Sequence, residues 1–268
     1  MRNADQDHNC RLAFVTGATG AIGKAIALEI ALQPGYSVVL LCRDEHRADE
    51  AACEIASLSG NECVTYELVD LSSKDSIQAV AQRRQEPVHV LVNNAAVTPR
   101  CRLETTAGIE LQFATNVLGY FWMIRAFNNH LRAATPSRVV NVASYWAGDL
   151  DLDDLEFRRR PYNNNSAYRQ SKQANRMLTV AFAERFQEHG VTVNACHPGD
   201  VNSPLSNELG FGGHESPQEG ARTPAWLATS PIGQQETGKY FEHRQMRRCR
   251  FGEDATAVHA LYEACMAY

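Results

Sequence analysis

Hydrophobic residues along this chain gather in short continuous runs, separated by longer stretches in which they recur every three to four positions. The runs are rich in Val, Leu and Ile and lie at about 12–16, 37–42, 63–69, 88–92, 138–143 and 191–196. Strands covered by helices on both faces have this continuous character, whereas half-exposed strands alternate. The pattern predicts an α/β fold, a doubly wound parallel sheet of about seven strands with helices on both faces.

The amino-acid composition of the chain changes after residue 200. The stretch "LGFGGHESPQEGARTP" is rich in Gly, Pro and polar residues, and a short strand-like "KYFE" at 239–242 and a final helix at about 253–266 follow it. Open parallel sheets bind ligands beyond the carboxyl ends of their strands, so we interpret 203–236 as a mobile substrate loop over that crevice. No linker divides the chain, and we expect 1–268 to form one domain after a flexible segment at 1–10.

Composition narrows the possible partners. Lys and Arg number 26 against 31 Asp and Glu, and the net charge of -5 argues against a nucleic-acid surface. The basic run "RQMRRCR" at 244–250 is interpreted as solvated surface. The eight cysteines include no C-x-x-C pair and no His at metal spacing, so we expect reduced thiols and no metal site. With a polar N-terminus and no long apolar run, we expect a cytoplasmic protein without a membrane anchor.

A glycine-rich turn follows the first strand in "LAFVTGATGAIGKAIALEIA". Gly17, Gly20 and Gly23 are spaced G-x-x-G-x-x-G, whereas the commonest dinucleotide fingerprint is G-x-G-x-x-G. The N–H groups and the dipole at the start of a helix favour an anion there. Gly17 would allow the tight turn, Gly20 or its neighbour would let the backbone approach a pyrophosphate, and Gly23 would let the helix pack on the sheet.

The end of the second strand bears on which dinucleotide binds. An acidic residue there would favour NAD, but this strand ends with Cys42 followed by Arg43. A guanidinium can pair bidentately with the 2'-phosphate of NADP, so NADP(H) is expected in preference to NAD(H). The alternative is a solvated Arg43 paired with Asp44. Lys24 would either add positive potential at the turn or lie on the outer face of the helix.

The segment "SAYRQSKQAN" sets Tyr168 and Lys172 four residues apart, on one face of a predicted helix. A tyrosine has a pKa of about 10, and a nearby ammonium would stabilise its phenolate. This pair alone is common on ordinary helices. Upstream, however, the strand "RVVNVAS" ends at Ser144, and Asn116 lies in the helical pattern "LQFATNVLGYF".

With these motifs in this order, the chain resembles the short-chain dehydrogenase/reductase family over nearly its whole length. The motifs are "TGATGAIG" at 16–23, "NNAA" at 93–96, "NVAS", "YRQSK" and "HPGDVNS" at 197–203. The chain departs from the family pattern at Ala21, Ala96 and His89, the last interpreted as structural. The shifted Gly20 also resembles the longer epimerase-like members, but length and a single domain weigh against that branch.

Within the family, the resemblance is to the retinol dehydrogenase-like reductases. It rests on "GIELQFATNVLGYF", "AYRQSKQANRML", "VNACHPGDV", "TGKYFE" and the acidic insertion "DLDLDDLEF". That group commonly prefers NADP(H), in agreement with the interpretation of Arg43. Many of its members carry an N-terminal membrane anchor that this sequence does not show, so membrane-delivered retinoids are not assumed as substrates.

The resemblance implies four catalytic residues. Tyr168 would be the general acid in reduction and the base in oxidation, and Ser144 would hydrogen-bond the substrate oxygen. Lys172 would lower the pKa of Tyr168 and hold the nicotinamide ribose, and Asn116 would anchor a water that links Lys172 to solvent.

The resemblance also implies the contacts to the cofactor. Asp70 would bind the adenine amino group, although a helix N-terminal cap is an equal alternative at that position. Pro198, Gly199, Val201 and Ser203 would hold the nicotinamide carboxamide. The full expected set is Gly17, Thr19, Gly20, Ala21, Ile22, Gly23, Arg43, Asp70, Leu71, Asn93, Asn94, Ala95, Tyr168, Lys172, Pro198, Gly199, Val201 and Ser203.

The sequence thus predicts an NADP(H)-dependent oxidoreductase that interconverts a carbonyl and an alcohol on a small to medium, apolar organic substrate. A dinucleotide-binding sensor with little turnover is the alternative, and a homodimer is left open. The proposed pocket walls, for which ordinary packing is the competing explanation, are Tyr145, Trp146, Leu150, Leu205 and Phe211.

Overall fold

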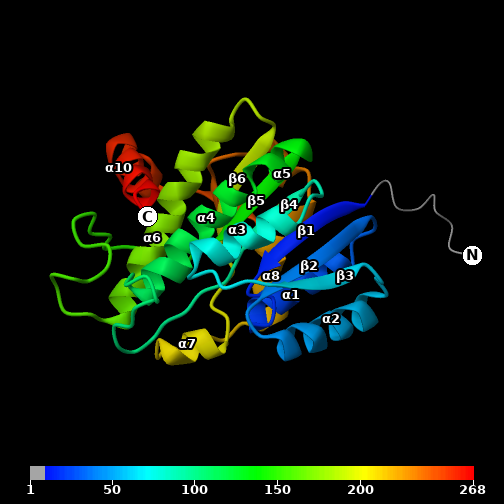
Figure 1. The fold of residues 1–268 in the computed structure, drawn as a ribbon, viewed down its shortest axis with the longest axis horizontal. Coiled ribbons are helices and arrows are strands. Elements are labelled where there is room, and N and C mark those ends of the chain that lie inside the picture. Colours follow the sequence, from blue (N-terminus) through cyan, green and yellow to red (C-terminus); the bar gives the residue numbers. More distant parts are fainter. Residues whose placement is uncertain (1–9) are drawn as a thin grey trace, which may run out of the picture.

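The computed structural model describes residues 10–268, which form one eight-stranded sheet flanked by helices (Figure 1). The strand order is β3-β2-β1-β4-β5-β6-β7-β8, and every neighbouring pair is parallel except β7 and β8. The strands are β1 (Arg11–Thr16), β2 (Tyr36–Cys42), β3 (Val64–Leu68), β4 (Val90–Asn93), β5 (Ser137–Val142), β6 (Val191–His197), β7 (Tyr240–Glu242) and β8 (Gln245–Arg247). The predicted single-domain, doubly wound α/β fold is confirmed.

Helices cover both faces of the sheet, which explains the continuous apolar runs of the central strands. On one face lie α1 (Ala21–Ala31), α2 (Glu45–Ser59) and α8 (Pro217–Thr229). On the other lie α3 (Lys74–Arg83), the π-helix η1 (Phe113–Leu118) continuing into α4 (Gly119–Ala126), α6 (Asn164–Phe186) and α10 (Ala255–Met266). The shorter helices are α5 (Asn128–Ala133), α7 (Pro204–Glu208), α9 (Ile232–Gln235) and η2 (Arg250–Gly252).

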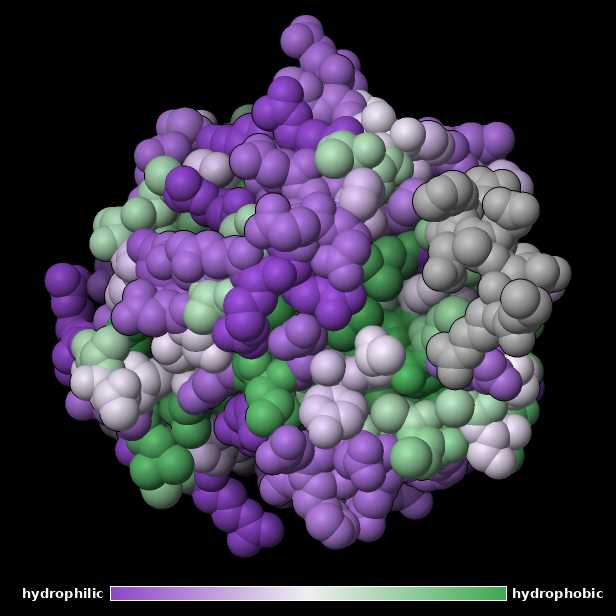
Figure 2. All heavy atoms as spheres, turned by 45° about the vertical axis from the view of Figure 1, so that its right-hand side comes forward, coloured by the Kyte–Doolittle hydropathy of each residue, from purple (hydrophilic) through white to green (hydrophobic). Residues whose placement is uncertain are grey.

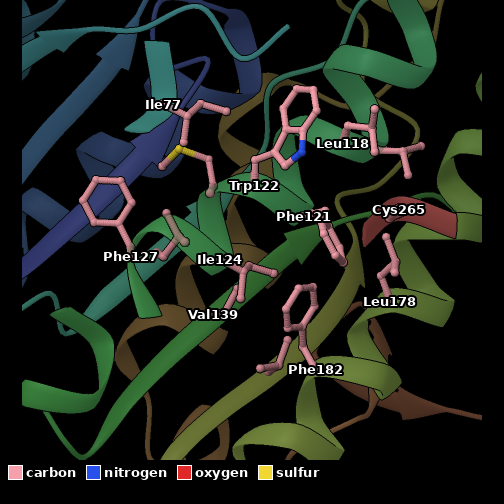
Figure 3. Packing of buried hydrophobic residues seen from close by; sticks show 14 of the residues in the cluster. Ile77, Leu118, Phe121, Trp122, Ile124, Phe127, Val139, Leu178, Phe182 and Cys265 are labelled. Atoms are coloured by element: carbon pink, nitrogen blue, oxygen red, sulfur yellow. The ribbon is translucent and has the colours of Figure 1, made fainter. Parts of the chain in front are cut away.

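The sheet separates a larger hydrophobic core, the first core, from a smaller one on its other face, the second core. Figure 3 shows part of the larger one, where Phe121 and Trp122 of α4 pack toward Ile77 of α3, Phe182 of α6 and Val139 of β5. The rings of Phe121 and Phe182 are 5.3 Å apart. Successive residues of a central strand face opposite cores, as Phe14 lies in one core and Val15 in the other.

The sequence pattern missed the eighth strand. β8 lies within the basic run 244–250, all three of its residues are exposed, and it pairs only with β7. The turn that joins the two strands places His243 at φ 48° and Arg244 at φ 60°. An edge strand that buries neither face needs no apolar residues, so hydrophobic periodicity carries no signal for it.

The interpretation of 203–236 as one mobile loop is wrong for most of its length. Residues 217–229 form α8, which starts at a capping box of Ser216 and Glu219 and buries Ala221 and Leu227 in the second core. Pro217 at the first position of the helix belongs to a helix start, and the Gly- and Pro-rich composition concealed it. Only the first part of the segment, with α7 and the turn after it, borders the pocket described below.

The molecular surface is mixed in character. Figure 2 shows hydrophobic side chains between hydrophilic ones at several places on the face that it draws. Such scattered exposure is ordinary for a folded chain. Over residues 10–268, none of the helices combines the length and the apolar character needed to cross a bilayer.

Candidate active site

The order in which strands are added to the sheet reverses between β1 and β4. The turns that follow these two strands meet at this point. Thr16, the last residue of β1, accepts hydrogen bonds at Oγ1 from the backbone N–H of Asn94 at 2.8 Å and of Ala95 at 3.1 Å. The Asn94 side chain in turn donates to the Thr16 carbonyl at 3.0 Å. Sequence reasoning did not single out Thr16, whose hydroxyl fixes the two turns against each other at the crevice where such sheets bind ligands.

The glycines of the first turn have distinct environments. A Cβ on Gly17, which has φ +65°, would lie 2.8 Å from the Cα of Ala95, and one on Gly23 would lie 2.3 Å from the Gly17 carbonyl oxygen. A Cβ on Gly20 would meet only that carbonyl oxygen, at 3.3 Å. Gly17 and Gly23 therefore serve close packing, while the open side of Gly20 leaves room for a ligand to approach the backbone.

The start of α1 is suited to an anion. Gly20 precedes α1, and no side chain caps the helix, which begins at Ala21 with no acidic residue in its first turn. The other helices of ten or more residues in the described part of the chain are capped by Asp44, Ser73, Asn163, Ser216 and Asp254. The first N–H groups of α1 thus lack the side-chain acceptor that those helices have, as expected where a phosphate binds.

Two arginines flank this turn. Arg43 is exposed, and its expected alternative partner Asp44 instead accepts the Arg47 backbone N–H at 2.9 Å as the N-cap of α2. The Arg47 guanidinium donates to the Thr19 carbonyl at 3.0 Å, a contact that the sequence did not suggest. Lys24 pairs with Glu54 of α2 at 2.7 Å and so lies on the outer face of the helix.

The end of β4 and the turns after β3 and β4 hold the remaining residues expected near the adenosine. Asp70 accepts from the backbone N–H of Ser72 at 2.9 Å, and Ser73 rather than Asp70 caps α3, so the alternative of a helix cap at Asp70 is wrong. Leu71 packs in the first core. The buried Asn93 side chain donates to Asn141 of β5 at 3.0 Å and joins the two strands. His89 accepts the Leu12 N–H at 3.1 Å, in keeping with a structural role.

Ser144 and Tyr168 line one cavity of about 210 Å³ at the carboxyl edge of the sheet. Ser144 follows β5, whereas Tyr168 lies in the first turns of α6, which starts at the Asn163 cap. Ile22 of α1 lines the same cavity, so the glycine turn and the serine–tyrosine pair face a common space. The lining residues are Ile22, Ser144, Tyr145, Trp146, Tyr168, His197, Pro198, Gly199, Asp200, Val201, Ser203, Leu205, Ser206 and Phe211.

Burial dominates the titration of the tyrosine and the lysine. It raises the pKa of Tyr168 to about 12, against a smaller lowering by a hydrogen bond with Ser144. It lowers the pKa of Lys172 to about 7. The Lys172 ammonium donates to the Val142 carbonyl at 2.9 Å and lies 5.7 Å from the centre of the Tyr168 ring. The Tyr168 hydroxyl is therefore protonated at neutral pH. Without a cofactor its pKa is raised by burial and is not lowered by Lys172.

Asn116 lies in the π-helix η1, where an ordinary helix was expected. Its side chain donates to the Val97 carbonyl at 3.0 Å and accepts the Val97 N–H at 2.8 Å, which ties the helix to the loop after β4. It also reaches the Ser171 hydroxyl at 3.4 Å. Single π-turns within helices are frequent at functional sites, and no sequence periodicity reveals them.

The segment after β6 forms one wall of the cavity. Gly199 has φ +116°, and a Cβ there would lie 1.9 Å from Oε2 of Glu215, a residue outside the expected set. Val201 is 4% exposed, and Ser203, at 8%, caps α7. Glycine is therefore favoured at 199 by its backbone conformation, because the Glu215 carboxylate is the end of a flexible side chain and could move aside.

Four of the five proposed pocket walls line the cavity. The rings of Trp146 and Phe211 meet edge to face at 5.1 Å, across the loop after β5 and the turn after α7. Leu150 does not line it, because it packs instead against the first core. The lining residues that sequence reasoning missed are His197, Asp200 and Ser206, although His197 directly precedes the Pro198 segment in the motif.

His197 is buried as a neutral imidazole. It is 7% exposed, its ring lies 4.7 Å from that of Tyr145, and its Nδ1 has no partner among the described residues. Burial, followed by the charges of His243 and Arg176, lowers its pKa to about 3. Below pH 6.5 the unfolded chain binds a proton that the folded chain does not, so stability falls from pH 6.5 toward pH 3.

We therefore expect His197→Gln to reduce the acid sensitivity of the fold. Between pH 7 and pH 4.5, wild type should lose about 2 kcal/mol more of its free energy of unfolding than the variant does. Urea denaturation at both pH values measures the difference. His46→Gln, at a side chain that is 83% exposed, is the control and should follow wild type. Equal losses in His197→Gln and wild type would contradict a neutral buried His197.

Comparison with known proteins agrees with this arrangement. A family model described as short chain dehydrogenase matches residues 11–211. Retinol dehydrogenase 13 of Mus musculus is 38% identical over 253 residues, which span 87% of this chain and 75% of that protein. Retinol dehydrogenase 14 of Homo sapiens is 35% identical over 86% of this chain and 77% of that protein.

The fold also matches solved structures. A crystal structure of an uncharacterized protein from Mycobacterium Paratuberculosis superposes with a TM-score of 0.79 at 27% identity, covering 96% of this chain and 93% of that one. Over residues 10–268, no group of three or more His, Cys, Asp or Glu side chains is arranged to hold a metal ion.

Proposed function

The chain belongs to the short-chain dehydrogenase family, an oxidoreductase family acting on alcohol and carbonyl groups with a nicotinamide dinucleotide, and from this premise we propose that it is an NADP(H)-dependent carbonyl reductase. The single observation that carries the proposal is the shared cavity. Ser144 and Tyr168 face the same space as Ile22, one residue into the uncapped helix after the glycine turn.

The residues at the turns would hold the cofactor, which when bound supplies the hydride. The open backbone at Gly20 and the first N–H groups of α1 suit the pyrophosphate. The segment from Pro198 to Ser203 would meet the nicotinamide, and Lys172 would meet its ribose. Asp70 and the turn after β4 would line the adenosine.

The catalytic roles follow from position and protonation. Ser144 would donate to the substrate oxygen as charge develops there, and Tyr168 would deliver the proton. A Tyr168 pKa of about 12 keeps the hydroxyl protonated at neutral pH, which suits a general acid in carbonyl reduction. Asn116 would anchor a water that links Lys172 to solvent.

The substrate would be apolar. Tyr145, Trp146, Leu205 and Phe211 supply hydrophobic and aromatic surface around the polar pair, as is typical of small-molecule pockets. Two relatives named as retinol dehydrogenases are consistent with an apolar alcohol or aldehyde.

A screen of ketones and aldehydes, with NADPH consumption followed by its absorbance, tests the function. Turnover of aromatic or branched apolar carbonyls is expected, and small charged carbonyls should react poorly. If no carbonyl is consumed while NADPH still binds, the dinucleotide-binding sensor would be the better description.

We expect Arg43→Ala to weaken NADPH binding about tenfold and to leave NADH binding unchanged, because only NADPH carries the phosphate that this exposed guanidinium would pair with. Titration of tryptophan fluorescence measures both dissociation constants. Arg132→Ala, an exposed arginine on α5, is the control and should change neither. Equal weakening of both dinucleotides by Arg43→Ala would argue against this role.

A further inference from the structure

Arg176 is a buried cation beside the candidate active site that the proposed mechanism does not use. It lies on α6 four residues after Lys172, so Tyr168, Lys172 and Arg176 follow one another along one side of the helix. It is 7% exposed and does not line the cavity. A buried guanidinium is costly unless it is well partnered, so its contacts show what it serves.

The Arg176 guanidinium donates a hydrogen bond to the backbone of the candidate catalytic serine. Its Nη2 donates to the Ser144 carbonyl, which also accepts the Ala147 N–H at 3.3 Å. The Ser144 hydroxyl accepts the N–H of Trp146 at 3.1 Å. Arg176 therefore bonds to the tight turn at 144–147 that carries the Ser144 hydroxyl and the aromatic wall Trp146.

Strand β7 fixes the other side of the guanidinium. The Arg176 Cζ lies 3.5 Å from the centre of the Tyr240 ring, and its Nη2 lies 4.0 Å from Glu242. The Tyr240 hydroxyl donates to the same Glu242 oxygen at 2.7 Å. The Tyr240 ring thus stacks on the guanidinium and Glu242 lies within ion-pair range of it, whereas Nε has no partner among the described residues.

We propose that Arg176 is a positioning residue that holds the Ser144 turn in its productive geometry from behind the active site, with β7 as its anchor. The proposal rests on the proposed function only in assigning Ser144 a catalytic role. The parallel with Lys172 is direct: two cations one helical turn apart donate to the carbonyls of Val142 and Ser144 at the end of the same strand. A displacement of the hydroxyl by about 1 Å is enough to impair catalysis.

A double-mutant cycle tests the route of action. We expect Arg176→Met to lower kcat at least tenfold, with the dissociation constant of NADPH changed less than twofold and partial recovery in Arg176→Lys. In the Ser144→Ala background the same substitution should lower kcat less than twofold, because the hydroxyl that it positions is absent. Equal losses in both backgrounds would show that Arg176 acts through general packing and would overturn the proposal.

Arg185→Met is the matched control. Arg185 also lies on α6, stacks on an aromatic ring, Tyr262, at 3.4 Å, and reaches an acidic residue, Glu263, at 3.9 Å, but it has no contact with the Ser144 turn. Its loss should leave kcat within twofold of wild type. A tenfold fall in this variant as well would count against a specific role for Arg176.

A crystal structure of Arg176→Met gives a readout that needs no turnover. The Ser144 hydroxyl should move away from the Trp146 N–H, whereas an unchanged turn would overturn the proposal. If wild type reduces no carbonyl, the proposed function fails, and the position of the turn still decides the role of Arg176.

Discussion

Tyr168→Phe should reduce carbonyl turnover about 10³-fold and leave NADPH binding within twofold of wild type. The substitution removes only the hydroxyl that would give its proton to the substrate oxygen. The ring, 8% exposed, keeps its place on α6, so the cavity and the turn that would hold the cofactor are preserved. Initial rates at saturating NADPH, together with fluorescence titration of the cofactor, measure the two quantities separately.

Tyr66→Phe is the control for this experiment. Tyr66 lies on β3, at the far side of the sheet from the cavity, and should turn over carbonyls as wild type does. A Tyr168→Phe variant that retains more than a tenth of the wild-type rate would contradict general acid catalysis by this hydroxyl. Loss of NADPH binding in the same variant would indicate instead that Tyr168 serves the cofactor site.

Gly23→Ala should destabilise the fold by at least about 2 kcal/mol, as overpacking at a fixed backbone does. Alanine is preferred over glycine within a helix by about 1 kcal/mol, so propensity alone predicts the opposite sign. At this position, however, the new methyl group would lie 2.3 Å from the Gly17 carbonyl oxygen and 2.6 Å from the Asn94 side chain. To avoid them, α1 must move away from the turn, and we expect NADPH binding to be lost as well.

Urea denaturation at neutral pH measures the effect, and Gly20→Ala is the matched control. Gly20 has φ -84°, and its added methyl group would meet only one atom, at 3.3 Å. The control should keep the stability of wild type within about 0.5 kcal/mol, as expected of substitutions away from close contacts. A Gly23→Ala protein as stable as Gly20→Ala would refute the packing role assigned to Gly23.

Ala21 and Ala96 are the two positions at which alanine stands where the family pattern has glycine. Ala21 opens α1, and the neighbouring Gly20 supplies the open backbone there. The shift of the middle glycine by one position therefore keeps an approach to the helix start, which the spacing of the glycines alone did not establish.

The features that could be predicted from the sequence are those that depend on residues close together along the chain. The central strands were placed to within about two residues, because strands buried on both faces must be continuously apolar. The pairing of Tyr168 with Lys172 was also readable, because a spacing of four residues selects one face of a helix. By contrast, β8 and α8 were missed. An exposed edge strand shows no hydrophobic periodicity, and the Gly- and Pro-rich composition around 217–229 concealed the helix.

The amino-acid sequence by itself determined the doubly wound sheet, the glycine turn and the order of the motifs, since each depends on residues near one another along the chain. Only the tertiary structure decided which side chains share the cavity, that burial raises the pKa of Tyr168 and lowers that of His197, and that Arg176 bonds to the Ser144 turn. These properties depend on desolvation and on contacts between segments far apart in sequence. No local pattern encodes them, because both arise only when the layers pack.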